Sequence, residues 1–164
     1  MVKVKKVIQI SPFLWRTDPE NGSHILKRTS TLCFDIYHKG FDCTVTVRFC
    51  GEVTDGQGFR CDGLSVPKIF RWFLPSWDEK NCLYNVAGAL HDWLYATKGN
   101  CGVFTREECD DIFRGLLRES GIGRFKAGCA DKAVEIFAGN KRHWGNDSYG
   151  VISLARMEVN RCLL

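Results

Sequence analysis

Residues 82–97 form the segment that most constrains how this chain of 164 residues can fold. Apolar residues recur along the segment at helical spacing, which predicts a long helix with a buried face. That face consists of Leu83, Val86, Ala87, Leu90 and Leu94. His91 and Asp92 stand side by side in the same segment, and a buried polar side chain is costly without a partner. We therefore expect neighbouring elements to supply partners for both side chains.

The part of the chain before about residue 78 has the composition of β-strands. β-Branched and aromatic residues concentrate in Val2–Ile10, Ser30–Tyr37 and Thr44–Phe49. The sequence HKGFD at His38–Asp42 is typical of a hairpin turn, which would join the second and third of these strands. A loop rich in glycine and aspartate, Gly51–Gly63, follows with weak strand character. An antiparallel sheet is the structure that this part predicts.

The pattern after residue 78 is helical. Thr105 and Glu108 form a capping box, which predicts the start of a second long helix, and Gly121 is the glycine expected at its end. Phe125–Gly139 has the apolar spacing of a third helix. The stretch Tyr149–Val159 is compatible with a weak strand or a helix.

These patterns predict a single α+β domain over residues 1–164, mainly β in 1–78 and mainly α in 79–164. An N-terminal antiparallel sheet would pack with a C-terminal bundle of about three helices. Hydrophobic residues make up 45% of the chain, enough for a core, but no apolar run is long enough to span a membrane. The basic N-terminus is expected to be a first strand and not a signal peptide. The net charge of +4 is small and scattered, which argues against a nucleic-acid partner.

Nine cysteines are the unusual feature of the composition. None forms a CxxC pair and no histidine stands at finger spacing, so a structural zinc site is not expected. Nothing marks Cys61 or Cys82 as an activated thiolate that would use His91 as its partner. The odd total leaves at least one thiol without an intramolecular disulfide. At least one loop or terminal cysteine is expected to make an intermolecular contact or disulfide, either Cys101, in a polar glycine-flanked loop, or Cys162, near the C-terminus.

Three further residues are expected to lie around His91. Side chains four residues apart share a helix face, so Tyr95 should lie over His91. Asp110 sits at the inner edge of the second helix and should come within hydrogen-bond distance of His91. Gly88, one turn before His91, leaves room for an approaching segment, and the turn that contains Asp62 is the polar backbone expected there.

Two interpretations of this cluster remain open. His91 could deprotonate a water while Asp92 and Asp62 hold a hard cation such as Ca²⁺. The same side chains could instead brace the core, with His91 bonded to Asp110 and a tyrosine.

The order of several motifs resembles a family of small phage and prophage proteins of unassigned function. The resemblance covers roughly residues 45–145 and rests on these elements: Thr54-Asp55 or Cys61-Asp62, Gly63-x-Ser65-Val66-Pro67, Trp72, Leu74-Pro75, Ala87-x-x-x-His91-Asp92-Trp93-Leu94-Tyr95, Asp110-x-x-Phe113, Gly121 and Gly139…Trp144. It implies an α+β fold and a phage origin.

A second, weaker similarity is to secreted phospholipases A2 of the short prokaryotic type. By position it implies that His91 is the base, Asp92 the Ca²⁺ ligand, and Asp110 the residue that orients His91. Asp62, or the backbone near it, would complete the cation shell. The cysteines that flank the histidine in those enzymes are absent here, where Leu90 and Leu94 stand.

The leading functional expectation is a virion component of the tail or baseplate, made in the host cytoplasm and contacting other tail proteins. The resemblance to phage proteins and the many thiols, which can cross-link subunits outside a cell, support it. The alternative is a phage-encoded, calcium-dependent hydrolase of lipid esters or other envelope bonds, with His91, Asp110 and Tyr95 as catalytic residues and Asp92 and Asp62 as metal ligands. An intracellular protein that binds a host factor is a third class.

Overall fold

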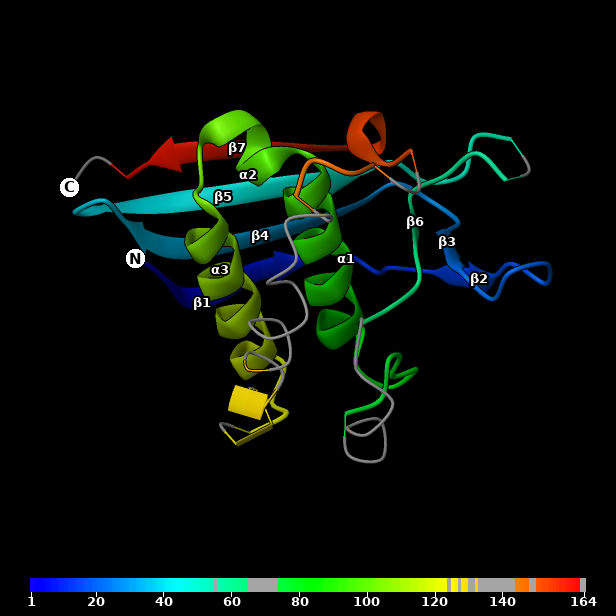
Figure 1. Cartoon of the computed structure of the whole chain (residues 1–164), viewed down its shortest axis with the longest axis horizontal. Coiled ribbons are helices and arrows are strands. Elements are labelled where there is room, and N and C mark those ends of the chain that lie inside the picture. The colour runs from blue at the N-terminus through cyan, green and yellow to red at the C-terminus, as the bar shows by residue number, and fades with distance from the viewer. Residues whose placement is uncertain are drawn as a thin grey trace.

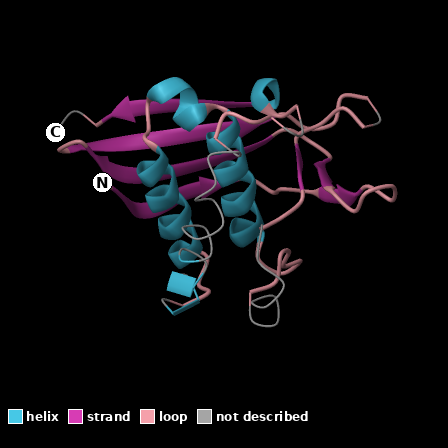
Figure 2. Cartoon of the chain, in the orientation of Figure 1, coloured by secondary structure: helices cyan, strands magenta, loops and turns pink. Residues whose placement is uncertain are grey.

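The computed structural model of the chain has an α+β fold, in which two long helices cover one face of an antiparallel sheet (Figures 1 and 2). It describes residues 1–54, 56–64, 74–123, 125–126, 128–129, 132, 144–147 and 150–162. No helix within these residues is long and apolar enough to cross a membrane.

The strands form two sheets. The strands are β1 (Val2–Ile10), β2 (Trp15–Thr17), β3 (His24–Leu26), β4 (Ser30–His38), β5 (Phe41–Phe49), β6 (Arg60–Cys61) and β7 (Ala155–Arg161). The main sheet has the order β1-β4-β5-β7, and the small sheet has the order β2-β3-β6. All pairings are antiparallel.

The predicted hairpin between β4 and β5 is confirmed. His38 pairs with Phe41, so that Lys39 and Gly40 alone form the turn. Both turn residues have positive φ angles, 50° and 87°, as expected for the two-residue turn that matches the twist of antiparallel strands.

The core lies between the main sheet and the helices α1 (Cys82–Ala96) and α3 (Arg106–Glu119). Alternate residues of the two central strands point into it, and Phe34, Val45 and Val47 are fully buried. The residues that alternate with these on β4 and β5 are half-buried or exposed. The helices therefore pack on one side of the sheet only, which places the contact between α1 and α3 over its middle.

A tight left-handed turn, α2 (Lys98–Gly102), reverses the chain between α1 and α3. Lys98, Asn100 and Cys101 have φ angles between 53° and 59°. Gly99 is required here, because a Cβ at this position would lie 1.9 Å from the carbonyl oxygen of Phe104. The turn brings the start of α3 back to the end of α1, so the two helices run antiparallel.

The C-terminal part differs in one respect from a purely helical region. Tyr149–Val159 contains both of the predicted alternatives: a short 3-10 helix, η2 (Ile152–Leu154), leads into β7, which pairs with β5 and forms an edge of the main sheet. The sequence did not indicate β2 and β3, which have only three residues each. The predicted third helix, Phe125–Gly139, falls mostly outside the described residues.

Candidate active site

His91 and Asp110 face each other across α1 and α3, as predicted. The Nε2 atom of His91 lies 2.9 Å from Oδ1 of Asp110. The His91 side chain is 10% exposed and that of Asp110 is 18% exposed, so the pair sits just below the surface. Both residues stand at the edge of an amphipathic face, which is why packing the two apolar faces brings them together.

Tyr95 contacts both members of the His91–Asp110 pair. Its hydroxyl donates a hydrogen bond of 2.8 Å to the same Oδ1 atom of Asp110. Its ring lies 4.3 Å from the imidazole of His91, as its spacing four residues later predicts. Burial raises the pKa of the Tyr95 phenol, and the net effect of its neighbours leaves it raised, so the hydroxyl stays protonated at neutral pH. Tyr95 is therefore a donor here.

Arg106, the first residue of α3, extends this network. Its Nε–H donates a hydrogen bond of 3.2 Å to the hydroxyl oxygen of Tyr95. Its guanidinium also lies 5.7 Å from the centre of the Tyr95 ring. The sequence reasoning missed Arg106, although it precedes Asp110 by four residues and so shares its face of the helix.

Donor and acceptor counting fixes the tautomer of His91. The Arg106 Nε–H can only donate, so the Tyr95 hydroxyl accepts from it and gives its own proton to Asp110. A carboxylate can only accept, so neutral His91 must carry its proton on Nε2. Nδ1 is then the basic nitrogen. It has no hydrogen-bond partner within the described residues, and it is not among their fully buried unpaired atoms.

Aromatic rings close the site around this network. The ring of Phe113 lies 4.6 Å from the His91 imidazole. The indole of Trp144 meets the Tyr95 ring edge-on at 5.3 Å, and the N–H of Gly145 donates to the carbonyl of Tyr95 at 2.8 Å. These contacts fix the orientation of both rings and limit the access of water.

Asp92 follows His91 on α1, and Asp62 lies close enough to Asp92 to act on its charge. Asp92 is half-buried and makes no hydrogen bond or ion pair within the described part of the chain. Burial raises the pKa of its carboxyl group well above the usual range, and the charge of Asp62 raises it further. Two neighbouring carboxylates of this kind would be stabilised by a cation. The described residues nevertheless contain no group of three or more His, Cys, Asp or Glu side chains that could hold a metal ion.

The turn after β6 packs against α1, but the space at Gly88 is not open. The side chain of Leu64 fills it, since a Cβ on Gly88 would lie 2.8 Å from Cδ1 of Leu64. The turn itself is fixed by the N–H of Leu64, which donates to the carbonyl of Ser76 at 2.7 Å. The predicted approach of this turn to Gly88 is confirmed, and it is the side chain of Leu64 that occupies the room left by the glycine. The Ser65-Val66-Pro67 motif lies outside the described residues.

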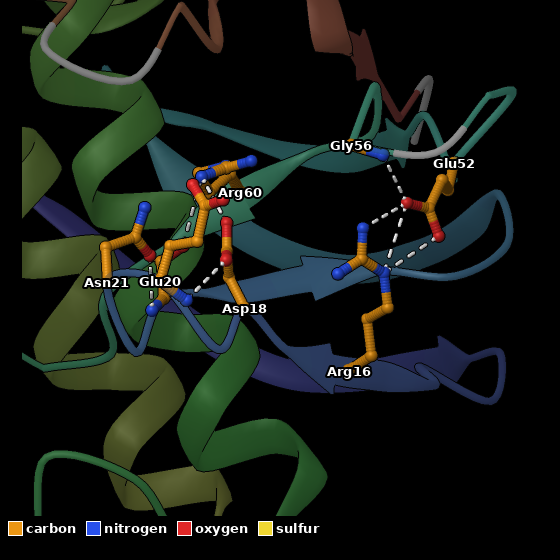
Figure 3. A network of polar contacts seen from close by, with 8 residues as sticks. Arg16, Asp18, Glu20, Asn21, Glu52, Gly56 and Arg60 are labelled. Atoms are coloured by element: carbon orange, nitrogen blue, oxygen red, sulfur yellow. Dashed lines mark hydrogen bonds and ion pairs between the residues drawn. The ribbon is translucent and has the colours of Figure 1, made fainter.

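A network of ion pairs fixes the small sheet from which this turn extends (Figure 3). Arg60, on β6, donates to Oδ2 of Asp18 at 2.9 Å. Arg16, on β2, pairs with Glu52, which also accepts a bond of 2.7 Å from the N–H of Gly56. The pair of Arg60 with Asp18 ties β6 to the loop that follows β2.

The cysteines lie outside the His91 network. Cys61 is buried, and burial raises its pKa far above the ordinary value, so it is not a thiolate at neutral pH. Cys101 and Cys162 are exposed, and all nine cysteines are free thiols. Cys162 is more ordered than a loose tail, because its N–H donates to the carbonyl of Asp42 at 2.9 Å.

Comparison with known proteins places the chain in a family. Residues 42–134, more than half of the chain, match the family described as "Protein of unknown function (DUF1353)". The chain belongs to the DUF1353 family. Searches of curated proteins and of solved structures gave no match.

The DUF1353 match contains the whole hydrogen-bond network of His91, whereas Trp144 and Gly145 lie beyond it. It runs from the start of β5 to beyond the end of α3, and so includes Asp62, His91, Tyr95, Arg106 and Asp110. Strands β1 to β4 and β7 lie outside it. The predicted membership of a family without an assigned function is confirmed. The description of the DUF1353 family does not bear on a phage origin or on phospholipases.

Proposed function

We propose that this chain is a hydrolase of ester bonds, with a lipid or another envelope component as substrate and His91 as the general base. One observation carries the proposal: His91 is bonded through Nε2 to Asp110, while Nδ1 has no hydrogen-bond partner among the described residues. A base needs a fixed ring and a free nitrogen within reach of water. A histidine that only braces a core needs neither.

The proposed reaction begins with a water hydrogen-bonded to Nδ1 of His91. The imidazole takes a proton from this water as its oxygen attacks the ester carbonyl carbon. The tetrahedral intermediate then collapses, the bond to the leaving alcohol oxygen breaks, and the imidazolium returns the proton to that oxygen. The products are a carboxylic acid and an alcohol, and His91 is regenerated.

Asp110 and Tyr95 support the charge that forms on His91. The Asp110 carboxylate, 2.9 Å from Nε2, stabilises the imidazolium and holds the ring in one orientation. The Tyr95 hydroxyl donates to the same carboxylate oxygen and holds it in place beside the imidazole. Asp110 therefore stabilises charge, and His91 moves the proton.

Asp92 and Asp62 are the proposed ligands of a calcium ion. The carboxyl group of Asp92 has no protein partner within the described residues, and the charge of Asp62 opposes its ionisation. Carboxylate and backbone carbonyl oxygens are the ligands that Ca²⁺ prefers. When bound, the ion would polarise the ester carbonyl and stabilise the oxyanion. No other metal ligand is assigned.

The test is product analysis with purified protein. Vesicles of phosphatidylglycerol and phosphatidylcholine, and soluble aryl esters, are incubated with the protein in millimolar calcium or in EGTA. The proposal expects release of fatty acid and lysophospholipid that stops in EGTA. If neither lipids nor aryl esters are hydrolysed by folded protein, the His91 network only braces the core, and the proposal fails.

The virion role is a second proposal, and the exposure of two thiols supports it. Cys101 and Cys162 are both accessible for disulfides between subunits of a tail or baseplate. Non-reducing electrophoresis and mass spectrometry of purified particles test it. A stoichiometric amount of the chain in cross-linked form is expected. A chain that is missing from particles, or present only as a monomer with both thiols free, would reject the cross-linked virion component.

A further inference from the structure

We infer that Arg106 is a positioning residue for the reaction of His91, acting through Tyr95 and Asp110 without touching the substrate. The inference rests on the proposed function. The contacts form one chain: Arg106 Nε to the Tyr95 hydroxyl at 3.2 Å, Tyr95 to Asp110 Oδ1 at 2.8 Å, and the same oxygen to His91 Nε2 at 2.9 Å.

The direction of these hydrogen bonds follows from which groups can donate and which can accept. Arg106 can only donate, so it occupies a lone pair of the Tyr95 oxygen and leaves the hydroxyl proton for Asp110. A hydroxyl that accepts from a cation is also a stronger donor, because hydrogen bonds in series polarise one another. Asp110 thereby holds less negative charge than it would alone. The same oxygen of Asp110 is held 2.9 Å from Nε2 of His91, so the contacts of Arg106 and Tyr95 keep the imidazole in one orientation.

The place of Arg106 in the helix supports a functional role over a stabilising one. It is the first residue of α3, directly after the capping residue Thr105. The N-terminal end of a helix carries partial positive charge, so a cation is unfavourable there, whereas the next two residues, Glu107 and Glu108, are favourable. A residue that is unfavourable for its position in a helix is expected where function requires it.

A double-mutant cycle between Arg106 and Tyr95 tests the inference. Arg106→Met keeps much of the aliphatic stem and removes the donor. We expect its kcat to fall about fivefold to tenfold with KM unchanged, since a hydrogen bond to a neutral group is of about that size. The Arg106→Met change should have little further effect in a Tyr95→Phe background, because the hydroxyl through which Arg106 acts is gone.

Arg118 supplies the matched control. It stands on the same helix but is exposed and far along it from Tyr95. Arg118→Met should leave kcat unchanged. The lost hydrogen bond and the relieved helix dipole act in opposite directions, so Arg106→Met should change the melting temperature by less than about 4 °C.

Three outcomes would overturn the inference. A rise in KM without a fall in kcat would mean that Arg106 binds substrate directly. An equal loss of activity in the wild-type and Tyr95→Phe backgrounds would mean that it acts by another route. A loss of activity that matches a loss of melting temperature would mean a structural role.

A spectroscopic readout keeps the inference separate from the proposed function. The Nε2-bound proton of His91 is observed by ¹⁵N-edited NMR at a fixed pH where the ring is neutral. Its resonance should move in Arg106→Met and in Tyr95→Phe but not in Arg118→Met. If the protein hydrolyses no ester, the proposed function fails, yet a moved resonance still demonstrates the coupling. An unmoved resonance in Arg106→Met rejects the coupling even in an active enzyme.

Discussion

Asp110→Ala should destabilise the protein more than Asp111→Ala, and the two neighbouring residues make a matched pair. Each side chain is 18% exposed, so burial does not distinguish them. Asp110 accepts from two inward-facing side chains, His91 and Tyr95. Asp111 accepts from the N–H of Val2 and forms an ion pair with a residue one turn along its own helix.

The expected magnitudes follow from these partners. Asp110→Ala leaves a phenol hydroxyl and an imidazole N–H without their acceptor near the interior, and we expect a loss of about 2–3 kcal/mol. Asp111→Ala removes the hydrogen bond from the N–H of Val2, which costs about 1 kcal/mol of stability. It also removes the ion pair with Arg114 on the same helix, which contributes only about 0.3–0.5 kcal/mol. The difference of about 0.5–1.7 kcal/mol corresponds to roughly 1–7 °C in melting temperature for a domain of this size.

Urea denaturation of the wild type and both variants measures this difference. The slopes of the transitions should agree, so that the midpoints report stability. An Asp111→Ala variant that is equally or more destabilised would refute the idea that the network around Asp110 is the tighter of the two. It would also remove the geometric basis for Asp110 as the residue that orients His91.

Three further predictions concern other parts of the site. Burial raises the pKa of Glu108, but the N–H of Thr105 and nearby positive charge outweigh burial, so the pKa is lowered overall. The ionised Glu108 side chain therefore stabilises the fold above its unfolded pKa of about 4.3. This stabilisation is lost as the pH falls through the lower pKa of the folded state. The advantage of the wild type over Glu108→Gln in urea should accordingly be clear at pH 6 and diminish as the pH falls below the unfolded pKa of about 4.3, and an advantage that grows on acidification would contradict this. Gly88→Ala should lower the melting temperature, because the side chain of Leu64 must move to make room for the added Cβ. Gly128→Ala should not lower it, because no atom lies within 4 Å of a Cβ added at this helical glycine. Millimolar calcium should raise the melting temperature of the wild type but not of Asp92→Asn, and equal shifts in both would place the ion elsewhere.

Much of the fold could be predicted because local chemistry and tertiary packing agree. The capping box of Thr105 and Glu108 is formed by both of its hydrogen bonds, and α3 begins at the next residue. The face of α1 predicted to be apolar packs in the core. The strands β2 and β3 could not be predicted, because three residues give no readable period and their pairing depends on distant ion pairs such as that of Arg60 with Asp18.

The candidate site, too, could be predicted only in part. The contact of His91 with Asp110 could be predicted, since both residues border faces that must pack together. The role of Arg106 could not, because an arginine at the start of a helix is usually solvated, and only the reversal of the chain through α2 brings it to Tyr95. The filling of the Gly88 position by Leu64 likewise depends on a turn whose path the sequence does not specify.

The most direct test of the central claim is the ratio of kcat between the wild type and His91→Gln, measured as fatty acid release from phospholipid vesicles in saturating calcium. A general base contributes roughly 10²–10⁴-fold, so His91→Gln should lose at least about a hundredfold in kcat while its circular dichroism spectrum matches that of the wild type. A folded His91→Gln variant that retains activity within about threefold of the wild type would contradict the assignment of His91 as the base.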